Sequence, residues 1–556
     1  WRKSRIAGWF RRLHTEEGAL EKTVAGRIVR CPFTFLEFLQ KKFGKRLAEA
    51  IENSSVLELC REYLNNLLAI NLRFIGYLLF VTSAGLILGQ MAGHQKVGWV
   101  LLGGAALGAV LTFFDVNVTD YLKGSAAAGL ICRLLGIEPD FNWYDERYTK
   151  GKERLLSAVF FGAAAGLLGG WVNPLLAPAL IIGFAAVFLV LKFPSAGVFF
   201  VVFAAPVAPT MADVGLALLS IFSLAIYSVT HKGFKFKFDG IGFFIIVFLG
   251  VYAVAAVTSF AMMNSFSIWA IYFVFISMYF VIINTVNTKK LLMNLLTVFV
   301  LSGFLVCLYG VAQYVFGWDT AQAWMDEEMF SDIKMRIYST LGNPNVLGEY
   351  ILLVLPASVG LMWVNKRFEA KVVYAAVSAL MFGALILTFS RGCWIGIMAA
   401  AAIFITFAAG KLWGLGLIAL PIIPMILPES IINRFSSIGN MEDSSTSYRV
   451  YIWMGTLAMI KDFWLSGIGM GQKAFTQVYP FYSYNGIVAP HSHNLFLQIL
   501  VESGIVGIAV FLIIAVLFLR RVMTGYQAGG KGDSLSTIMT ALSAGVCGFL
   551  LQGMFD

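Results

Sequence analysis

The chain alternates between long apolar stretches and short polar connections over most of its length. About fifteen apolar stretches approach or reach the length of roughly 17–25 residues that a helix needs to cross a bilayer. They lie at 74–91, 97–114, 155–171, 175–191, 195–211, 212–230, 241–263, 268–286, 291–316, 346–364, 372–388, 392–408, 414–427, 504–520 and 535–551. Several are short or interrupted by Pro, so two could be re-entrant. The pattern predicts an all-α polytopic membrane protein with about 13–15 transmembrane helices and a long extracytoplasmic loop before the last spans.

Composition agrees with this class. The 556 residues are 59% hydrophobic and 13% charged, roughly half the charged fraction of a soluble protein. The formal net charge is +10, but basic residues of membrane proteins collect on the cytoplasmic side and meet anionic lipid, so we expect no nucleic-acid partner. The six Cys form no CxxC pair, so no disulfide framework or zinc site is predicted. Because the first residue is Trp, we expect the natural termini to lie outside this sequence.

Three regions are predicted along the chain. Residues 1–73 are rich in Lys and Arg with helical apolar spacing, which is typical of a cytoplasmic or interfacial amphipathic segment. Residues 74–154 predict an N-terminal helical pair followed by a cytoplasmic loop containing "EPDFNWYDERYTKGKER". Residues 155–556 predict a multi-span core with two long extracytoplasmic loops, 317–345 and 428–503.

The charges of the connections predict which way the chain crosses the membrane. Every second connection is basic, which marks the cytoplasmic side. These connections hold Lys192, the segment 231–237, Lys289, Lys290, Lys366, Arg367, Lys371, Lys411, Arg520, Arg521 and Lys531. Four arginines then fall on the outer side, against the general bias, and need a specific reason: Arg336, Arg391, Arg434 and Arg449.

The outer arginines are candidate ligands for an anion. Arg391 lies in a turn of a few residues between two spans, where a guanidinium suits a phosphate oxygen; the alternative is an arginine that reaches lipid phosphate. Arg449 falls in the first turn of a helix predicted over 448–463, which is unfavourable for a cation unless an anion binds there. The nearby "GIGMG" (467–471) resembles a phosphate loop, but a turn between packed helices explains it as well.

Acidic residues in the outer loops are weighed in the same way. Asn343-Pro344-Asn345 predicts a helix start, and Glu349 one turn further is a carboxylate that needs a partner, such as an outer arginine. Asp326, Glu327 and Glu328 are adjacent on a polar loop, a pattern that solvation explains, so no metal site is predicted.

The stretch "PHSHNLFLQILVESGIVG" (490–507) combines two histidines with a predicted helix start. If the helix begins near His491–Asn494, its free N–H groups attract phosphate and hold a nearby imidazole neutral, ready to accept a proton. The alternative is that His491 and His493 only cap the helix. Gln498 and Glu502 face other helices, and the glycines at 504 and 507 allow close helix packing.

These motifs together resemble the O-antigen ligase superfamily, which includes O-antigen polymerases and bacterial protein O-oligosaccharyltransferases. His493-Asn494, nine residues, then Gly504-x-x-Gly507 is similar to its H-[NSQ]-x9-GxxG signature. Three further segments resemble recurring family segments in the same order: "RIYSTLGNPNVLGEYILLVLP", "LTFSRGCWIG" and "SYRVYIWMGTLAMIKDFWLSGIGMG". The resemblance covers about 336–507, whereas 1–154 matches nothing assignable.

The resemblance implies an inverting, metal-independent glycosyltransferase of GT-C-like fold in a bacterial inner or plasma membrane, with no cofactor. The donor would be a glycan on undecaprenyl diphosphate, and the acceptor a hydroxyl on a lipid, a glycan or a protein. By the same resemblance, His493 is the expected base or acceptor-positioning residue, and Arg391 the pyrophosphate ligand, with Arg449 and Arg336 as supporting cations. His491, Asn494 and Glu349 are expected to support the site.

Elementary chemistry agrees with these roles, and two alternatives remain open. Arginines can stabilise a leaving pyrophosphate without Mg²⁺, and transfer to an alcohol needs a proton acceptor such as His493. A polymerase of lipid-linked repeat units would use the same donor and differ in the acceptor. A flippase or transporter of the lipid-linked glycan is the non-enzyme alternative, although such proteins usually carry polar sites near mid-membrane rather than at one surface.

Overall fold

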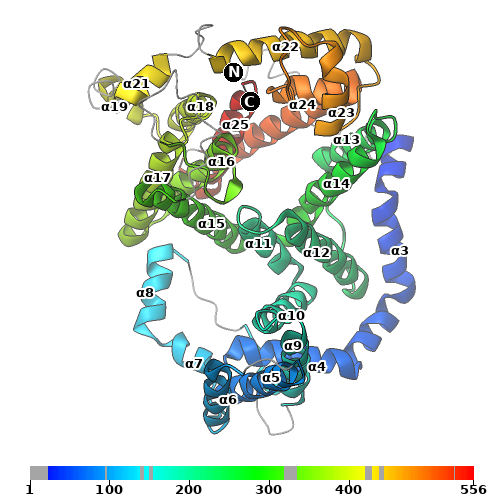
Figure 1. Cartoon of the computed structure of the whole chain (residues 1–556), viewed down its shortest axis with the longest axis vertical. Helices are drawn as coiled ribbons and strands as arrows, with labels where there is room; N and C mark the ends of the chain where they lie inside the picture. Colours follow the sequence, from blue (N-terminus) through cyan, green and yellow to red (C-terminus); the bar gives the residue numbers. More distant parts are fainter. Residues whose placement is uncertain are drawn as a thin grey trace. The chain divides into compact units, whose positions relative to one another are not determined.

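The computed structural model is all-helical (Figure 1). It describes residues 23–93, 97–137, 143–149, 155–318, 335–419, 429–436, 444–530 and 532–555. In these ranges no strand occurs, and one isolated bridge joins Asn71 and Asn117, so the predicted all-α class is confirmed. Part of each predicted outer loop, including the acidic triplet 326–328, lies outside the described residues. The chain divides into two compact units: a small unit (33–198 and 218–236) and a large unit (1–32, 199–217 and 237–556).

Ten helices of the described chain are long and apolar enough to cross a membrane. They are α5 (Leu72–Ala92), α12 (Thr210–Thr230), α13 (Gly240–Val257), α14 (Met262–Thr285), α15 (Lys289–Phe316), α16 (Pro344–Val364), α17 (Phe368–Leu387), α18 (Arg391–Ala408), α24 (Leu495–Gly529) and α25 (Ser534–Gln552). Four other expected spans correspond to shorter apolar helices: α6 (Trp99–Leu111), α9 (Leu156–Trp171), α10 (Leu176–Lys192) and α11 (Pro194–Ala204). The last expected span, 414–427, includes the end of α19 (Leu412–Ala419) and residues outside the described ranges.

The small unit is built on an aromatic core and on glycine contacts between helices. Tyr63 of α4 (Ser55–Ala69) is fully buried and packs its ring 4.5 Å, between centroids, from that of Phe161. Helices α5 and α9 meet backbone to backbone, since a Cβ atom on Gly89 would lie 2.6 Å from the Gly170 Cα. Such small-residue contacts let helices pack closely without a large apolar side chain between them. The unit also contains α6, α10, α7 (Val118–Lys123), α8 (Ala126–Leu135), η2 (Glu146–Tyr148), and parts of α11, α12 and α3 (Val24–Glu52).

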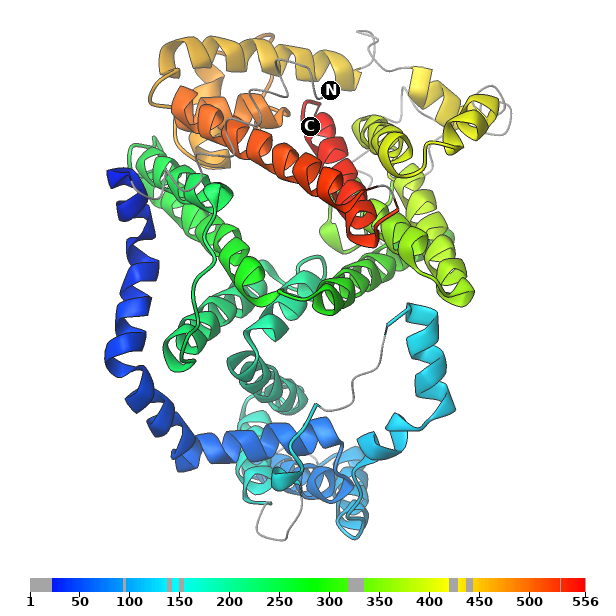
Figure 2. The ribbon, with the colours of Figure 1, turned by 180° about the vertical axis from the view of Figure 1, so that it is seen from behind.

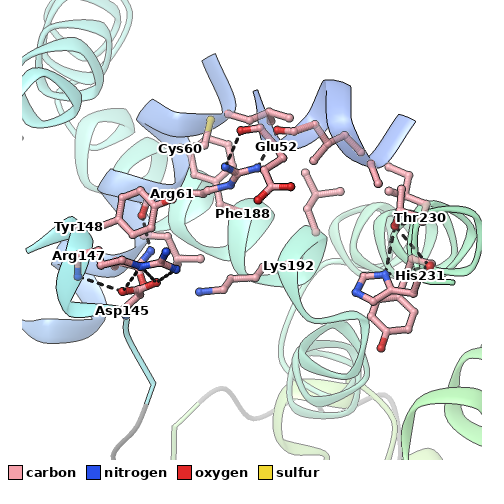
Figure 3. A pocket seen from close by; sticks show the side chains of 18 residues that line it. Glu52, Cys60, Arg61, Asp145, Arg147, Tyr148, Phe188, Lys192, Thr230 and His231 are labelled. Carbon is pink, nitrogen blue, oxygen red and sulfur yellow. Dashed lines mark hydrogen bonds and ion pairs between the residues drawn. The ribbon is translucent and has the colours of Figure 1, made fainter. Parts of the chain in front are cut away.

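Segments of the small unit that the charge pattern assigns to the cytoplasmic side lie together. Asn65 of α4 accepts a hydrogen bond from the Asp145 amide at 2.8 Å, and Gln40 of α3 donates to the His231 carbonyl at 2.7 Å. Between them lies a pocket of about 570 Å³ lined by charges of both signs, among them Arg61 and Lys192 (Figure 3). Four stretches far apart in sequence therefore meet around this pocket.

The core of the large unit lies among α15, α16, α17, α18 and α25. Helix α25 packs closely against both α16 and α18 through glycines. A Cβ atom on Gly548 would lie 2.5 Å from the Gly396 carbonyl oxygen of α18, and one on Gly545 would lie 2.8 Å from the Leu352 carbonyl oxygen of α16. These contacts fix the end of α25 beside the beginnings of α16 and α18, at the end of the helices that the charge pattern places outside.

Helix α24 is broken at Gly504, which has φ 68° and accommodates a neighbouring loop. Ile505 N donates to the Trp464 carbonyl at 2.7 Å, and a Cβ atom on Gly504 would lie 2.2 Å from the Leu465 carbonyl oxygen. The predicted close packing at this glycine is therefore observed, but its partner is loop backbone rather than another helix.

The "GIGMG" segment is the loop that fills this break. Ile468 N and Gly469 N donate to the carbonyls of Val501 and Glu502 at 2.9 and 3.1 Å. These amides are engaged by α24, so the segment is the turn between packed elements and not a phosphate loop. It connects α22 (Ser444–Phe463) to α23 (Gln472–Val478) and η5 (Tyr479–Phe481). The other short elements of the large unit are η4 (Ser339–Leu341) and α21 (Glu429–Ser436).

Candidate functional site

Arg391 is the first residue of α18, directly after a three-residue turn that follows α17. The turn is tight, since Phe389 has φ 51°. Arg391 is 9% exposed, which argues against an arginine that extends from the surface to lipid phosphate. A buried cation at a helix N-terminus lies in an unfavourable field, and a bound anion would offset it.

Arg336 is attached to the same turn. Its Nε donates to the Thr388 carbonyl at 2.8 Å, and its Nη2 donates to the Asn345 side-chain oxygen at 3.0 Å. Asn345 lies in the first turn of α16, which begins at Pro344 with Asn343 as its N-cap, as predicted. Arg336 therefore joins the end of α17 to the start of α16.

Glu349 lies one turn further along α16 and contacts a residue that the sequence analysis missed. Its Oε1 accepts a hydrogen bond from Gln552 Nε2 at 3.0 Å. Gln552 ends α25 and is fully buried, and its Cγ would lie 3.4 Å from a Cβ atom on Gly392, the neighbour of Arg391. Gln552 therefore joins α16 to the start of α18. The signal in the sequence was an amide at the end of an apolar span.

The residues after Gln552 connect this group to the histidine segment. Leu495 N donates to the Gly553 carbonyl at 2.6 Å, and the Asn494 side-chain amide donates to the Met554 carbonyl at 2.8 Å. Asn494 is also the N-cap of α24, with its Oδ1 accepting from Leu497 N at 3.0 Å, so the helix begins where the sequence predicts. The chain end thus lies among α18, α22 and α24 (Figures 1 and 2).

His493 is held by contacts from α22. The Trp453 indole N–H donates to the His493 carbonyl at 3.2 Å, and the rings of His493 and Tyr448 lie 6.0 Å apart between centroids. The His491 ring lies 4.0 Å from that of His493. Burial raises the pKa of Tyr448, so its phenol stays neutral beside the imidazole.

Arg449 follows Tyr448 on α22, and here the sequence prediction needs a correction. Helix α22 begins at Ser444, so Arg449 is its sixth residue and lies in the second turn rather than the first. Ser445, Thr446 and Ser447, which precede the predicted helix, are therefore part of it. The argument that Arg449 opposes the helix N-terminal field is correspondingly weaker, because that field falls off within the first turn.

A chain of hydrogen bonds joins the histidine loop, residues 491–493, to the first part of α24. Ser492 N donates to Gln498 Oε1 at 2.8 Å, and Gln498 Nε2 donates to Glu502 Oε1 at 2.9 Å. The same Glu502 oxygen accepts from Gly471 N at 2.9 Å. Gln498 and Glu502 therefore hold the His491–His493 loop against the break in α24.

Comparison with protein families identifies this part of the molecule. Residues 376–512 match the family model described as O-antigen ligase. Over residues 376–512 the chain is similar to an O-antigen ligase domain. The recognition from sequence motifs is confirmed, and the family indicates a membrane glycosyltransferase of the O-antigen ligase or polymerase type. None of the curated proteins compared with the chain matches it.

The O-antigen ligase match runs from α17 into α24 and includes Arg391, Arg449 and His493. Arg336 and Glu349 precede the matched range, and Gln552 follows it. The contacts above bring residues from before, within and after the match to the same end of the helices.

Strained backbone conformations occur close to Arg336, Arg391 and His493. Five non-glycine residues have positive φ in the described ranges: Ile70, Ser339, Phe389, Asn485 and His493. His493 is one of them, with φ 48°, Phe389 precedes Arg391 by two residues, and Ser339 follows Arg336 by three. Such conformations cost about 1–3 kcal/mol each and concentrate at functional sites, where the surroundings enforce them.

The electrostatics of this end of the O-antigen ligase domain favour an anion. Helices α16, α18 and α24 all begin here, so three positive dipole ends lie near Arg336 and Arg391. This combination suits a phosphate or diphosphate.

Proposed function

We propose that the chain transfers a glycan from undecaprenyl diphosphate to an acceptor hydroxyl on the outer face of the membrane, as an inverting, metal-independent O-antigen ligase. The observation that carries the proposal is that Gln552–Met554 joins the Arg336–Arg391–Glu349 group to the His493 loop. One group supplies cations for a leaving diphosphate, and the other supplies a proton acceptor.

The proposed reaction is a single displacement at the anomeric carbon. The acceptor oxygen forms a bond to this carbon as the bond to the diphosphate oxygen breaks, and the hydroxyl proton passes to His493. Arg391 and Arg336, with Arg449 in support, stabilise the negative charge that develops on the diphosphate. His491 and Asn494 hold the His493 loop, and Glu349 positions Gln552 beside α18.

The acceptor determines whether the product is that of a ligase or of a polymerase. The donor chemistry is the same in both, so the residues above are compatible with either. A lipid, glycan or protein hydroxyl is therefore tested as the acceptor. The ligase reaction is the proposal, because the matching family is described as O-antigen ligase.

The test is reconstitution of the full chain in proteoliposomes with undecaprenyl-diphosphate-linked glycan and each class of acceptor. We expect His493→Asn to lower the rate by about 10²–10⁴-fold, the usual contribution of a general base. Asn suits this position because it tolerates positive φ better than most residues. Arg367→Gln on the opposite, cytoplasmic side is the control and should retain the rate.

The same variants separate the enzyme from a flippase. In cells, an inactive glycosyltransferase should leave the lipid-linked donor accumulated on the outer face of the membrane. A His493→Asn variant that instead traps the donor on the inner face would contradict the proposal and favour transport.

A further inference from the structure

A cavity in the large unit lies among membrane helices, apart from the candidate site. It has a volume of about 590 Å³ and is lined by residues of α11, α12, α14, α15, α16 and α25. That volume is in the range of small-molecule sites, about 300–1,000 Å³. Most of the wall is aliphatic or aromatic, with Phe275, Phe299 and Leu542 among the residues. The exceptions are Thr210, Asp213 and Tyr350.

Asp213 is the unexpected member of this wall. It is 3% exposed, and its Oδ1 is buried with no hydrogen-bond partner among the described residues. A carboxyl group in such surroundings is costly unless something donates a hydrogen bond to it. Its place in the first turn of α12 favours an acidic residue, but its Oδ1 accepts no hydrogen bond from a backbone amide there.

We propose that this cavity binds a lipid whose head group donates a hydrogen bond to Asp213 and carries no negative charge. The apolar wall takes the hydrocarbon chain, and the Tyr350 hydroxyl provides a second polar group near the head. A phosphate head group is disfavoured, because an anion beside a carboxylate is repelled. The site is therefore chemically distinct from the proposed diphosphate site, with its cluster of arginines.

The position of the cavity gives this lipid a route to influence the candidate site. Tyr350 is the neighbour of Glu349 on α16, and Thr340 Oγ1 donates to the Pro206 carbonyl, between α11 and α12, at 2.6 Å. A lipid in the cavity would therefore contact α16, the helix that carries Glu349 and binds Arg336 through Asn345. The binding inference itself rests only on the cavity and Asp213, and it stands whether or not the proposed transfer reaction is correct.

The test measures binding to the purified full chain in detergent by native mass spectrometry, with long-chain monoacylglycerol as the probe. The methyl ester of the same fatty acid lacks a hydrogen-bond donor, and the fatty-acid anion carries a negative charge. We expect monoacylglycerol to bind about ten-fold more tightly than either, the effect of one hydrogen bond to a buried acceptor. Equal binding of the methyl ester or the anion would overturn the proposal.

Two substitutions of Asp213 sharpen the test. Asp213→Leu should remove the preference for monoacylglycerol, yet raise the thermal midpoint of the lipid-free protein, because an unpartnered buried carboxyl is replaced by an apolar side chain. Asp213→Asn keeps an acceptor but not the negative charge, so it should retain the preference over the methyl ester and lose the preference over the fatty-acid anion. An unchanged preference in Asp213→Leu, or a lower midpoint that reveals a structural partner of the carboxyl, would contradict the inference.

Discussion

At the scale of single residues, Arg391 combines burial with a position at the start of α18. Its planar guanidinium can donate two parallel hydrogen bonds to a diphosphate, whereas a lysine ammonium acts as a point charge. We therefore expect Arg391→Lys to lower the transfer rate by about 100-fold, the order found on removing one preorganised donor. Initial rates in proteoliposomes measure this loss.

The matched control for this substitution is Arg367→Lys. Arg367 is exposed and lies before α17, at the end of the helix that is opposite to Arg391. The control should keep the full rate. An Arg391→Lys variant as active as this control would show that the guanidinium geometry is not used.

The contact between Gln552 and Glu349 can be tested by a double-mutant cycle. Both side chains belong to the large unit, and the hydrogen bond between them joins the end of α25 to the start of α16. We expect Gln552→Ala and Glu349→Ala each to lower the transfer rate, and the double variant to lose little more than either single variant. Losses that multiply in the double variant would show that the two residues act independently.

At the scale of elements, the break in α24 is a joint that depends on one glycine. Gly504→Ala would place a Cβ atom 2.2 Å from the Leu465 carbonyl oxygen and force alanine into a backbone with φ 68°. We expect a loss of about 1–3 kcal/mol in the free energy of unfolding from the strained backbone alone. Thermal unfolding in detergent measures it.

Gly383→Ala in α17 is the control for this substitution. A Cβ atom on Gly383 would meet no atom within 4 Å, and alanine is the better helix former by up to about 1 kcal/mol. The control should be neutral or slightly more stable. A Gly504→Ala variant as stable as Gly383→Ala would contradict the prediction. It would show that the backbone of residues 464–467 can move to accommodate the added Cβ atom.

The elements show what the sequence could predict and what it could not. Apolar length and turn chemistry located α16 and the start of α24, because Asn343 and Asn494 are local signals that act within one turn. The role of "GIGMG" was not decidable from spacing, since the partners of its amides lie some thirty residues away at Val501 and Glu502. Gln552 was missed for the same reason: its contact with Glu349 spans 203 positions in sequence.

Helix length was the least predictable property of the elements. The expected span 97–114 became α6, which covers only Trp99–Leu111. This shorter helix packs closely against α5 through a glycine, since a Cβ atom on Gly108 would lie 2.6 Å from the Phe80 amide nitrogen. Close pairing of this kind depends on the neighbouring helix, and a hydropathy pattern does not contain it.

At the scale of the whole molecule, the proposed function depends on which ends of the helices face outward. The basic connections place Lys232 on the cytoplasmic side, whereas Phe481 lies in the segment predicted outside. Both residues are exposed, so each can carry a reporter cysteine in a variant without the six native cysteines. In intact spheroplasts, a membrane-impermeant maleimide should label Phe481→Cys but not Lys232→Cys, and a permeant maleimide should label both. Labelling of Lys232→Cys alone by the impermeant reagent would place Arg391 and His493 at the cytoplasmic face, where no outer-face transfer could occur.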